Sequence, residues 1–339
     1  MIDESIEKIT EKIENRERDI AQKKYEKLEK KRLGEEEKVK RLRERDEHTK
    51  KLLENASFSE MTTQQKIWVT LKLVIYAGTP FLIYMFMPGI IIALGSTVFF
   101  RTLTNLPTSG SITATNFYTF IGIICALLYL ARRARKHGST ISQDISISFK
   151  ELNYKYLGYM FLFGLCSAIF VSAILTLIPD SLMTAYDDAT VDFDGYSMGV
   201  TLLAIGLLDP IAEEIVFRGY MLNRLLPTIS EKKSVWIVTI IFALCHLSPL
   251  WILYTIAIGY VLAKISIRHD NIMYSIFIHL GFNFNTVLNY IFYLNPKINE
   301  LLFGNKILIL CYAIIFGTLA YTLVRYYDKQ ENIGLFTKK

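Results

Sequence analysis

The sequence contains only four cysteines among its 339 residues, and no two of them form a CxxC pair. The zinc-binding signature HExxH is also absent. Each cysteine lies within an apolar run, so we interpret all four as buried thiols rather than as a disulfide framework or a zinc site. The four are Cys125, Cys166, Cys245 and Cys311.

Charged residues are scarce after residue 57. Residues 1–57 hold 17 of the 38 Lys and Arg residues and 16 of the 32 Asp and Glu residues. The rest of the chain is therefore far more apolar than the overall hydrophobic content of 52% suggests, and a soluble chain is usually less apolar and more charged. The net charge of +6 comes mostly from short basic loops beside apolar segments. It therefore indicates membrane topology and not nucleic-acid binding.

Eight apolar stretches are long enough to cross a bilayer, since about 20 helical residues span the hydrocarbon core. They lie at 67–87, 113–131, 154–178, 199–226, 234–250, 251–267, 271–294 and 304–326. A further apolar run at 88–100 either extends the first span or lies at the membrane interface. Loops rich in Lys and Arg stay in the cytoplasm, and eight spans with both termini inside place every basic loop there. The sequence therefore predicts an all-α, polytopic membrane helix bundle of about eight spans.

The chain divides into two parts at about residue 57. Residues 1–57 predict a charged helical cytoplasmic extension. Isoleucines at 2, 6, 9, 13 and 20 keep a heptad-like spacing, which leaves open a short coiled coil that pairs two chains or docks a partner. Residues 58–339 form the predicted membrane domain, with a catalytic core at about 199–294. We expect a multi-pass membrane protein, in the cell membrane if the source is prokaryotic.

Three of the predicted spans carry polar residues that a membrane segment rarely tolerates. An ionisable side chain in a span costs about 2.5–3.5 kcal/mol on insertion scales and therefore indicates function. The fourth span contains Glu-Glu-x-x-x-Arg at 213–218, the fifth Phe-x-x-x-His at 242–246 and the seventh His-x-x-x-Asn at 279–283. Taken singly, each motif also has a structural explanation, as a buried ion pair, a packing histidine or an interhelical polar contact.

Helical geometry assigns different directions to the two adjacent glutamates. At about 100° per residue, Arg218 lies about 40° from Glu214 and about 140° from Glu213. We therefore expect Glu214 and Arg218 to form an i,i+4 ion pair. Glu213 is left free to point elsewhere.

The three motifs also lie at similar depths in the membrane. At about 1.5 Å per residue, Glu213 is ~21 Å from the cytoplasmic end of its span, and His246 and Asn283 are each ~18 Å from theirs. His279 lies one helical turn lower. Because alternate spans run in opposite directions, sequence spacing does not impose this agreement, and it predicts one site built from three helices.

This set of side chains is typical of a hydrolase. A carboxylate and an imidazole together activate water as a general base. A second imidazole and a carboxamide donate hydrogen bonds to the oxyanion that forms when water attacks a carbonyl. A zinc ion held by Glu213, His246 and His279 stays open as an alternative, since Glu and two His are the ligands of some metalloproteases.

The three motifs, in this order and each within a predicted span, resemble those of the CPBP family. This family comprises the type II CAAX prenyl endopeptidases and bacteriocin-processing or immunity proteins, and it is also called the abortive infection family. The resemblance covers roughly residues 150–294 and does not cover residues 1–57. It implies an eight-span helical fold with a cavity open to the cytosol.

The resemblance also implies a role for each motif residue. Glu213 and His246 would activate water, while His279 and Asn283 would form the oxyanion site. The supporting residues Glu214 and Arg218 would orient the base or steady the substrate backbone. The implied activity is hydrolysis of a peptide bond in a membrane-proximal protein or peptide, prenylated or not, with no cofactor in the glutamate mechanism and zinc in the metal-dependent one.

Two other classes of function stay open from the residues alone. Intramembrane Glu, His and Asn side chains also serve proton-coupled or cation transporters, although the sequence shows no internal repeat of the transporter kind. A non-catalytic scaffold or bacteriocin-immunity protein would use residues 1–57 as its working part. The expected partners are a protein or peptide substrate, membrane lipids and, through residues 1–57, a second copy of the chain.

Overall fold

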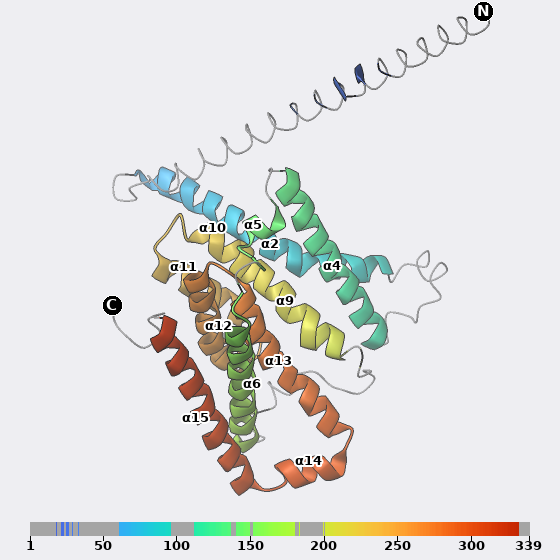
Figure 1. Ribbon diagram of the computed structural model, residues 1–339, viewed down its shortest axis with the longest axis vertical. Helices are drawn as coiled ribbons and strands as arrows, with labels where there is room; N and C mark the ends of the chain where they lie inside the picture. Colours follow the sequence, from blue (N-terminus) through green and yellow to red (C-terminus); the bar gives the residue numbers. More distant parts are fainter. Residues whose placement is uncertain are drawn as a thin grey trace, which may run out of the picture.

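The computed structural model describes residues 61–95, 112–136, 140–149, 152–179 and 201–331, with a few isolated positions elsewhere. Within these ranges every regular element is helical (Figure 1). This confirms the predicted all-α fold. The coiled coil expected within 1–57 lies outside the described residues, apart from a few isolated positions.

The described chain begins with four helices before the motif-bearing region. They are α2 (Thr63–Gly95), α4 (Ile112–Lys136), the short α5 (Ile141–Asp144) and α6 (Tyr154–Leu177). A continuous helical segment follows, called here the glutamate helix, made of η1 (Thr201–Leu208), α9 (Asp209–Glu214), η2 (Ile215–Leu222) and α10 (Asn223–Leu225). The remaining helices are α11 (Glu231–Leu244), α12 (Pro249–His269), α13 (Met273–Tyr293), α14 (Pro296–Phe303) and α15 (Lys306–Glu331).

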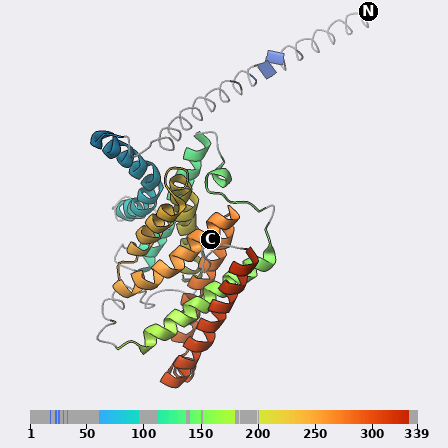
Figure 2. The same ribbon diagram turned by 90° about the vertical axis from the view of Figure 1, so that its left-hand side faces the viewer.

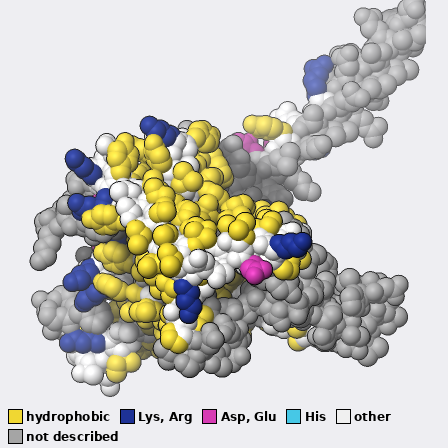
Figure 3. Space-filling model, turned by 90° about the horizontal axis from the view of Figure 1, so that it is seen from below, with side chains coloured by type: hydrophobic (Ala, Val, Ile, Leu, Met, Phe, Trp, Pro, Cys, Tyr) yellow, Lys and Arg dark blue, Asp and Glu magenta, His cyan; other side chains and the backbone are white. Residues whose placement is uncertain are grey.

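Each of the eight expected spans corresponds to a helix or, at 201–225, to the glutamate helix. Four of the described helices are long and apolar enough to cross a membrane by length and composition: Thr63–Leu94, Tyr154–Leu177, Pro249–His269 and Lys306–Gln330. The apolar run that begins at residue 88 continues α2 as far as Gly95. The short helix α14 was not expected. Much of the surface seen from below is apolar, with Lys and Arg side chains mostly toward its edge (Figure 3).

The C-terminal boundary expected for the span 234–250 is wrong, because the helix ends several residues earlier. The helix α11 stops at Leu244, and a turn separates it from α12. Ser248 adopts an extended conformation, because the residue before a proline is disfavoured in the α region. Pro249 then begins α12. His246 therefore lies in the turn between two helices and not within a span.

The four cysteines are free thiols, as expected, but not all of them are buried. Cys166 is buried, whereas Cys311 is exposed on α15. The reason is that α15 presents one side to the surroundings of the bundle, which for a membrane helix is lipid, so an apolar run does not by itself place a side chain in the core.

Arg224 anchors α2 to the glutamate helix. Pro80 lies inside α2 and has no N–H to donate to the carbonyl of Tyr76, four residues earlier. The Arg224 guanidinium donates to this Tyr76 oxygen at 2.7 Å and also stacks over the Tyr76 ring at 4.8 Å. A side chain of the glutamate helix thus satisfies the α2 carbonyl that Pro80 leaves without a helical hydrogen bond.

Two glycines allow α6 and α13 to touch through their backbones. A Cβ atom at Gly164 would overlap the carbonyl of Ile278, and one at Gly281 would overlap the carbonyl of Phe161. Small residues at helix contacts are the usual route to close packing in membranes, where apolar burial between helices gives little driving force. The contact fixes the position of α13, which also packs against η1, α9 and α12. Figures 1 and 2 show α6 between α13 and α15.

The glutamate helix departs from α-helical geometry on both sides of its two glutamates. The segments 201–208 and 215–222 are π-helical, and the α-helical segment 209–214 lies between them. The uniform 100° per residue assumed for this span is therefore wrong in detail. Single π-helical turns occur frequently at functional sites.

Candidate active site

Glu214 and Arg218 form the expected ion pair. Arg218 Nη1 lies 2.6 Å from Glu214 Oε1, and both side chains are fully buried. Arg218 Nη2 also donates to the carbonyl of Gly259 on α12 at 3.2 Å. The guanidinium is thereby held by charge on one side and by a backbone oxygen on the other, so the pair ties the glutamate helix to α12.

Phe242 packs between the three motifs. Its ring lies under the Arg218 guanidinium at 4.3 Å. It makes edge contacts with His246 at 5.1 Å and with His279 at 5.7 Å between ring centroids. Edge-to-face packing fixes ring orientation as well as distance. The phenylalanine of the second motif thus orients both imidazoles.

His279 lies between the two adjacent glutamates. Its Nδ1 is 2.9 Å from Glu214 Oε1, and its Nε2 is 3.6 Å from Glu213 Oε2. An ionised carboxylate only accepts hydrogen bonds, so we assign the Nδ1 proton to the contact with Glu214. The first and third motifs therefore meet at one imidazole.

Exposure separates the roles of the two glutamates. The Glu213 side chain keeps 22% of its surface exposed, whereas Glu214 keeps none. Of the two glutamates, only Glu213 therefore has surface that is open to a small molecule. The buried Glu214 accepts from Arg218 and His279 through the same oxygen, Oε1.

His246 lies beside this pair in the turn after α11. Its Nδ1 lies 3.0 Å from the carbonyl of Phe242, and its ring packs against Trp251 at 5.0 Å. The Glu213 carboxylate is among its electrostatic neighbours. The next residue, Leu247, has a φ of 62° and is 82% exposed. A left-handed leucine is strained, and such strain clusters at functional sites.

Asn283 faces the glutamate helix through its side-chain amide. Nδ2 donates to the carbonyl of Ile205 at 3.0 Å. In a π-helix the N–H of residue 210 would bond to this oxygen, but Pro210 has none. Asn283 thus supplies the hydrogen bond that the Ile205 carbonyl cannot receive from Pro210. The second N–H of its amide remains for another acceptor.

Two further ionisable residues, Asp209 and Tyr84, interact electrostatically with the motif residues, although the three motifs do not contain them. Asp209 interacts electrostatically with Glu213 and His279, and Tyr84 with Asp209 and Glu213. The spacing of Asp209 four residues before Glu213 was a usable signal, because i,i+4 residues share a helix face. Tyr84 comes from α2, far away in sequence, and no spacing signal points to it.

The site does not have the arrangement of a metal centre. Among the described residues, no group of three or more His, Cys, Asp or Glu side chains could hold a metal ion. Nδ1 of each imidazole contacts a protein oxygen, which leaves Nε2 of each as the nitrogen that can face a ligand or substrate. No step proposed below therefore runs through a metal.

A comparison with known proteins agrees with this geometry. Residues 196–285 match the family model described as "Type II CAAX prenyl endopeptidase Rce1-like". The matched segment contains all three motifs, from Glu213 to Asn283. No curated protein and no solved structure matches the chain. The segment 196–285 is therefore similar to the Rce1-like type II CAAX prenyl endopeptidases, and this match supports membership of the CPBP family.

Proposed function

We propose that the chain is an intramembrane endopeptidase in which Glu213 and His246 activate a water molecule. The main support is the imidazole of His279, which is hydrogen-bonded to Glu214 at 2.9 Å and lies 3.6 Å from Glu213. This contact brings an accessible carboxylate, a buried ion pair and a hydrogen-bond donor to one place.

In the proposed first step, Glu213 removes a proton from water while the oxygen attacks the carbonyl carbon of the peptide bond. His246 holds the same water through Nε2, since its Nδ1 contacts the Phe242 carbonyl. Low solvent access strengthens both interactions, because the dielectric is lower than in bulk water. The products of this step are a tetrahedral oxyanion and a protonated Glu213.

The oxyanion is proposed to be stabilised by Asn283 and His279. Asn283 uses the N–H that does not contact Ile205. For His279 to donate through Nε2 while Nδ1 donates to Glu214, both nitrogens must carry protons. The imidazolium charge balances Glu213 before the attack and the oxyanion after it, as Arg218 balances Glu214 throughout. Donors of this kind contribute about 3–4 kcal/mol to a transition state.

The second step breaks the C–N bond and returns the proton. The electron pair of the oxyanion re-forms the carbonyl, and the amine leaves with the proton that Glu213 took from water. The new carboxyl group keeps the water oxygen. Glu213 ends as a carboxylate, so the enzyme is regenerated.

The proposed substrate is a peptide segment close to the membrane, and a prenylated CAAX-type peptide is the first to test because of the family description. We also propose that both termini are cytoplasmic, since this places the basic loops on the cytoplasmic side. We propose as well that two copies of the chain associate through residues 1–57.

Cleavage of a farnesylated reporter peptide by the purified full chain, with and without a chelator, tests this function. Glu213→Gln and His246→Ala should each abolish cleavage while the protein stays folded in detergent. Glu231→Gln is the matched control, because Glu231 is an exposed acid on α11 paired with Lys264. Parent-like cleavage by both site variants would refute the mechanism, and loss of activity with chelator would refute its metal-free form.

A further inference from the structure

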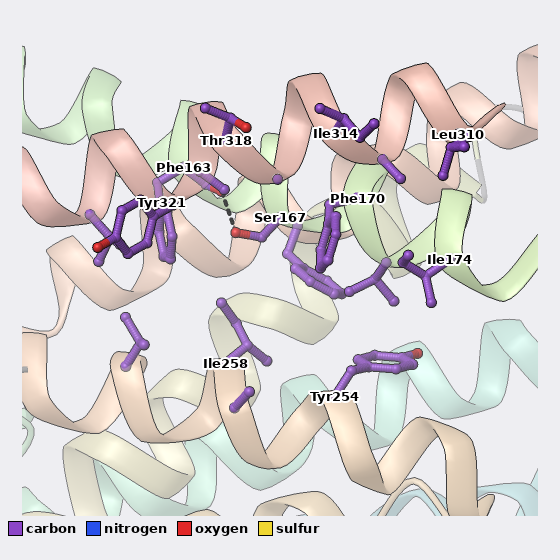
Figure 4. Close-up of a pocket in the computed structure, with 18 residues that line it drawn as sticks. Phe163, Ser167, Phe170, Ile174, Tyr254, Ile258, Leu310, Ile314, Thr318 and Tyr321 are labelled. Carbon is purple, nitrogen blue, oxygen red and sulfur yellow. Dashed lines mark hydrogen bonds between the residues drawn. The ribbon is translucent and has the colours of Figure 1, made fainter. Parts of the chain in front are cut away.

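A long apolar groove runs along the bundle between α6, α12 and α15. Its volume is about 690 Å³. Its walls come from α6, α12 and α15, and Phe282 of α13 contributes to the lining. Phe170 and Ile174 on α6, Tyr254 and Ile258 on α12 and Ile314 on α15 point into it (Figure 4).

The groove belongs to the hydrocarbon depth of the membrane. Its three walls are three of the four described helices that are long and apolar enough to cross a bilayer. Ser167, one of its few polar residues, donates its hydroxyl to the Phe163 carbonyl at 2.7 Å (Figure 4). A ligand of the groove therefore has to be apolar along its length.

The length of the groove fits one leaflet of the bilayer. The distance along α6 from Phe163 to Ile174 is roughly 16 Å, at the α-helical rise. One leaflet contributes about half of the ~30 Å hydrocarbon core. An extended acyl chain has this reach.

One end of the groove points toward basic residues, one on each of the three walls. The N-terminal end of α6 and the C-terminal ends of α12 and α15 meet there, since Tyr327 contacts both Tyr156 and His269. Three exposed basic residues lie beyond the lining at this end: Lys155 on α6 and Arg268 on α12, each about two helical turns away, and Arg325 on α15, next to Val324 of the lining. The Arg325 guanidinium lies 5.9 Å from the ring of Tyr321, which lines the groove.

We propose that this groove binds an acyl chain of an anionic phospholipid, with the phosphate headgroup at Lys155, Arg268 and Arg325. Basic side chains at the membrane surface attract anionic lipid headgroups, and the apolar walls take the chain. The proposal is independent of the peptidase mechanism, because none of these residues contacts Glu213 or His246 in the geometry described above.

Native mass spectrometry of the full chain in detergent tests the proposal, using phosphatidylglycerol and phosphatidylcholine with identical chains. The parent should hold one phosphatidylglycerol more tightly than phosphatidylcholine. Lys155→Ala and Arg325→Ala should each weaken phosphatidylglycerol binding about fivefold and leave phosphatidylcholine unchanged. Lys72→Ala, which changes an exposed lysine on α2, is the control for charge.

Filling the groove tests the chain site. Ala257→Phe places a ring in the groove from α12, and Thr318→Phe does so from α15. Either variant that folds should lose both lipids, while Leu253→Phe, on the exposed face of α12 outside the groove, should bind as the parent does. Parent-like binding by the filled variants would overturn the proposal, as would equal binding of the two lipids by the parent. Loss of a dimer on filling would assign the groove to a second copy instead.

Discussion

Replacing Arg218 by methionine should destabilise the protein strongly, because it leaves a buried carboxylate without its main partner. Methionine keeps much of the apolar stem and removes the charge. The lost contacts are the 2.6 Å ion pair with Glu214, the 3.2 Å hydrogen bond to Gly259 and the position over the Phe242 ring. The contact between His279 and Glu214 would remain.

The magnitude follows from the burial of the pair. Removing one partner of a buried ion pair costs about 3–5 kcal/mol, since the other charge stays in a medium of low dielectric. The remaining contact to His279 keeps the expected loss inside that range. Replacing both partners, as Glu214→Gln with Arg218→Met, should cost less than the single change, because no buried charge remains.

Lys264 and Glu231 provide a control, because they form an ion pair with the same N–O distance and less burial. Their N–O distance is also 2.6 Å, but the side chains keep 19% and 50% of their surface exposed. An exposed pair contributes about 0–1 kcal/mol. Lys264→Met should therefore change the free energy of unfolding far less than Arg218→Met.

Unfolding in mixed micelles, with increasing denaturing detergent, measures these free energies. The free energies of Glu214→Gln alone, Arg218→Met alone and the double variant form a cycle that gives the coupling between Glu214 and Arg218. If Arg218→Met and Lys264→Met lower the free energy of unfolding equally, burial does not govern these pairs and the reasoning fails.

Two further predictions concern helix packing and the oxyanion. Gly281→Ala should lower the midpoint of unfolding, because its Cβ would overlap the Phe161 carbonyl. Gly158→Ala should leave the midpoint unchanged, because nothing lies within 4 Å of the added Cβ. Equal midpoints for the two variants would contradict the close contact of α6 and α13. His279→Ala and Asn283→Ala should each lower kcat about 10²–10³-fold with little change in KM. An unchanged kcat with a raised KM in the same peptide assay would argue against the oxyanion role.

The helical spans and the ion pair could be predicted because both depend on local sequence. Apolar length fixed the approximate position of all eight helical segments, and an i,i+4 spacing sufficed to pair Glu214 with Arg218. The π-helical turns around 209–214 were not predictable in this way. They depend on repairs from other helices, such as the amide of Asn283 that satisfies the Ile205 carbonyl.

The position of His246 shows a second limit. Hydropathy continues across residues 234–250, so an apolar count places the histidine inside a span. The backbone instead turns before Pro249, and His246 lies in that turn, where Glu213 acts on it electrostatically. Tyr84 shows a third limit, because its place near Glu213 comes from the packing of α2 against the glutamate helix.

Two adjacent glutamates are equivalent in sequence, and their surroundings make them different. Glu214 points into the bundle, where Arg218 and His279 use its charge and no water reaches it. Glu213, one residue earlier, retains access to water and faces the other nitrogen of the same imidazole. A base must reach water and an orienting group must not move, so the exposed residue suits proton transfer and the buried one suits support. Exchanging the two surroundings would require turning the helix by about 100°, which the tie from Arg218 to Gly259 prevents.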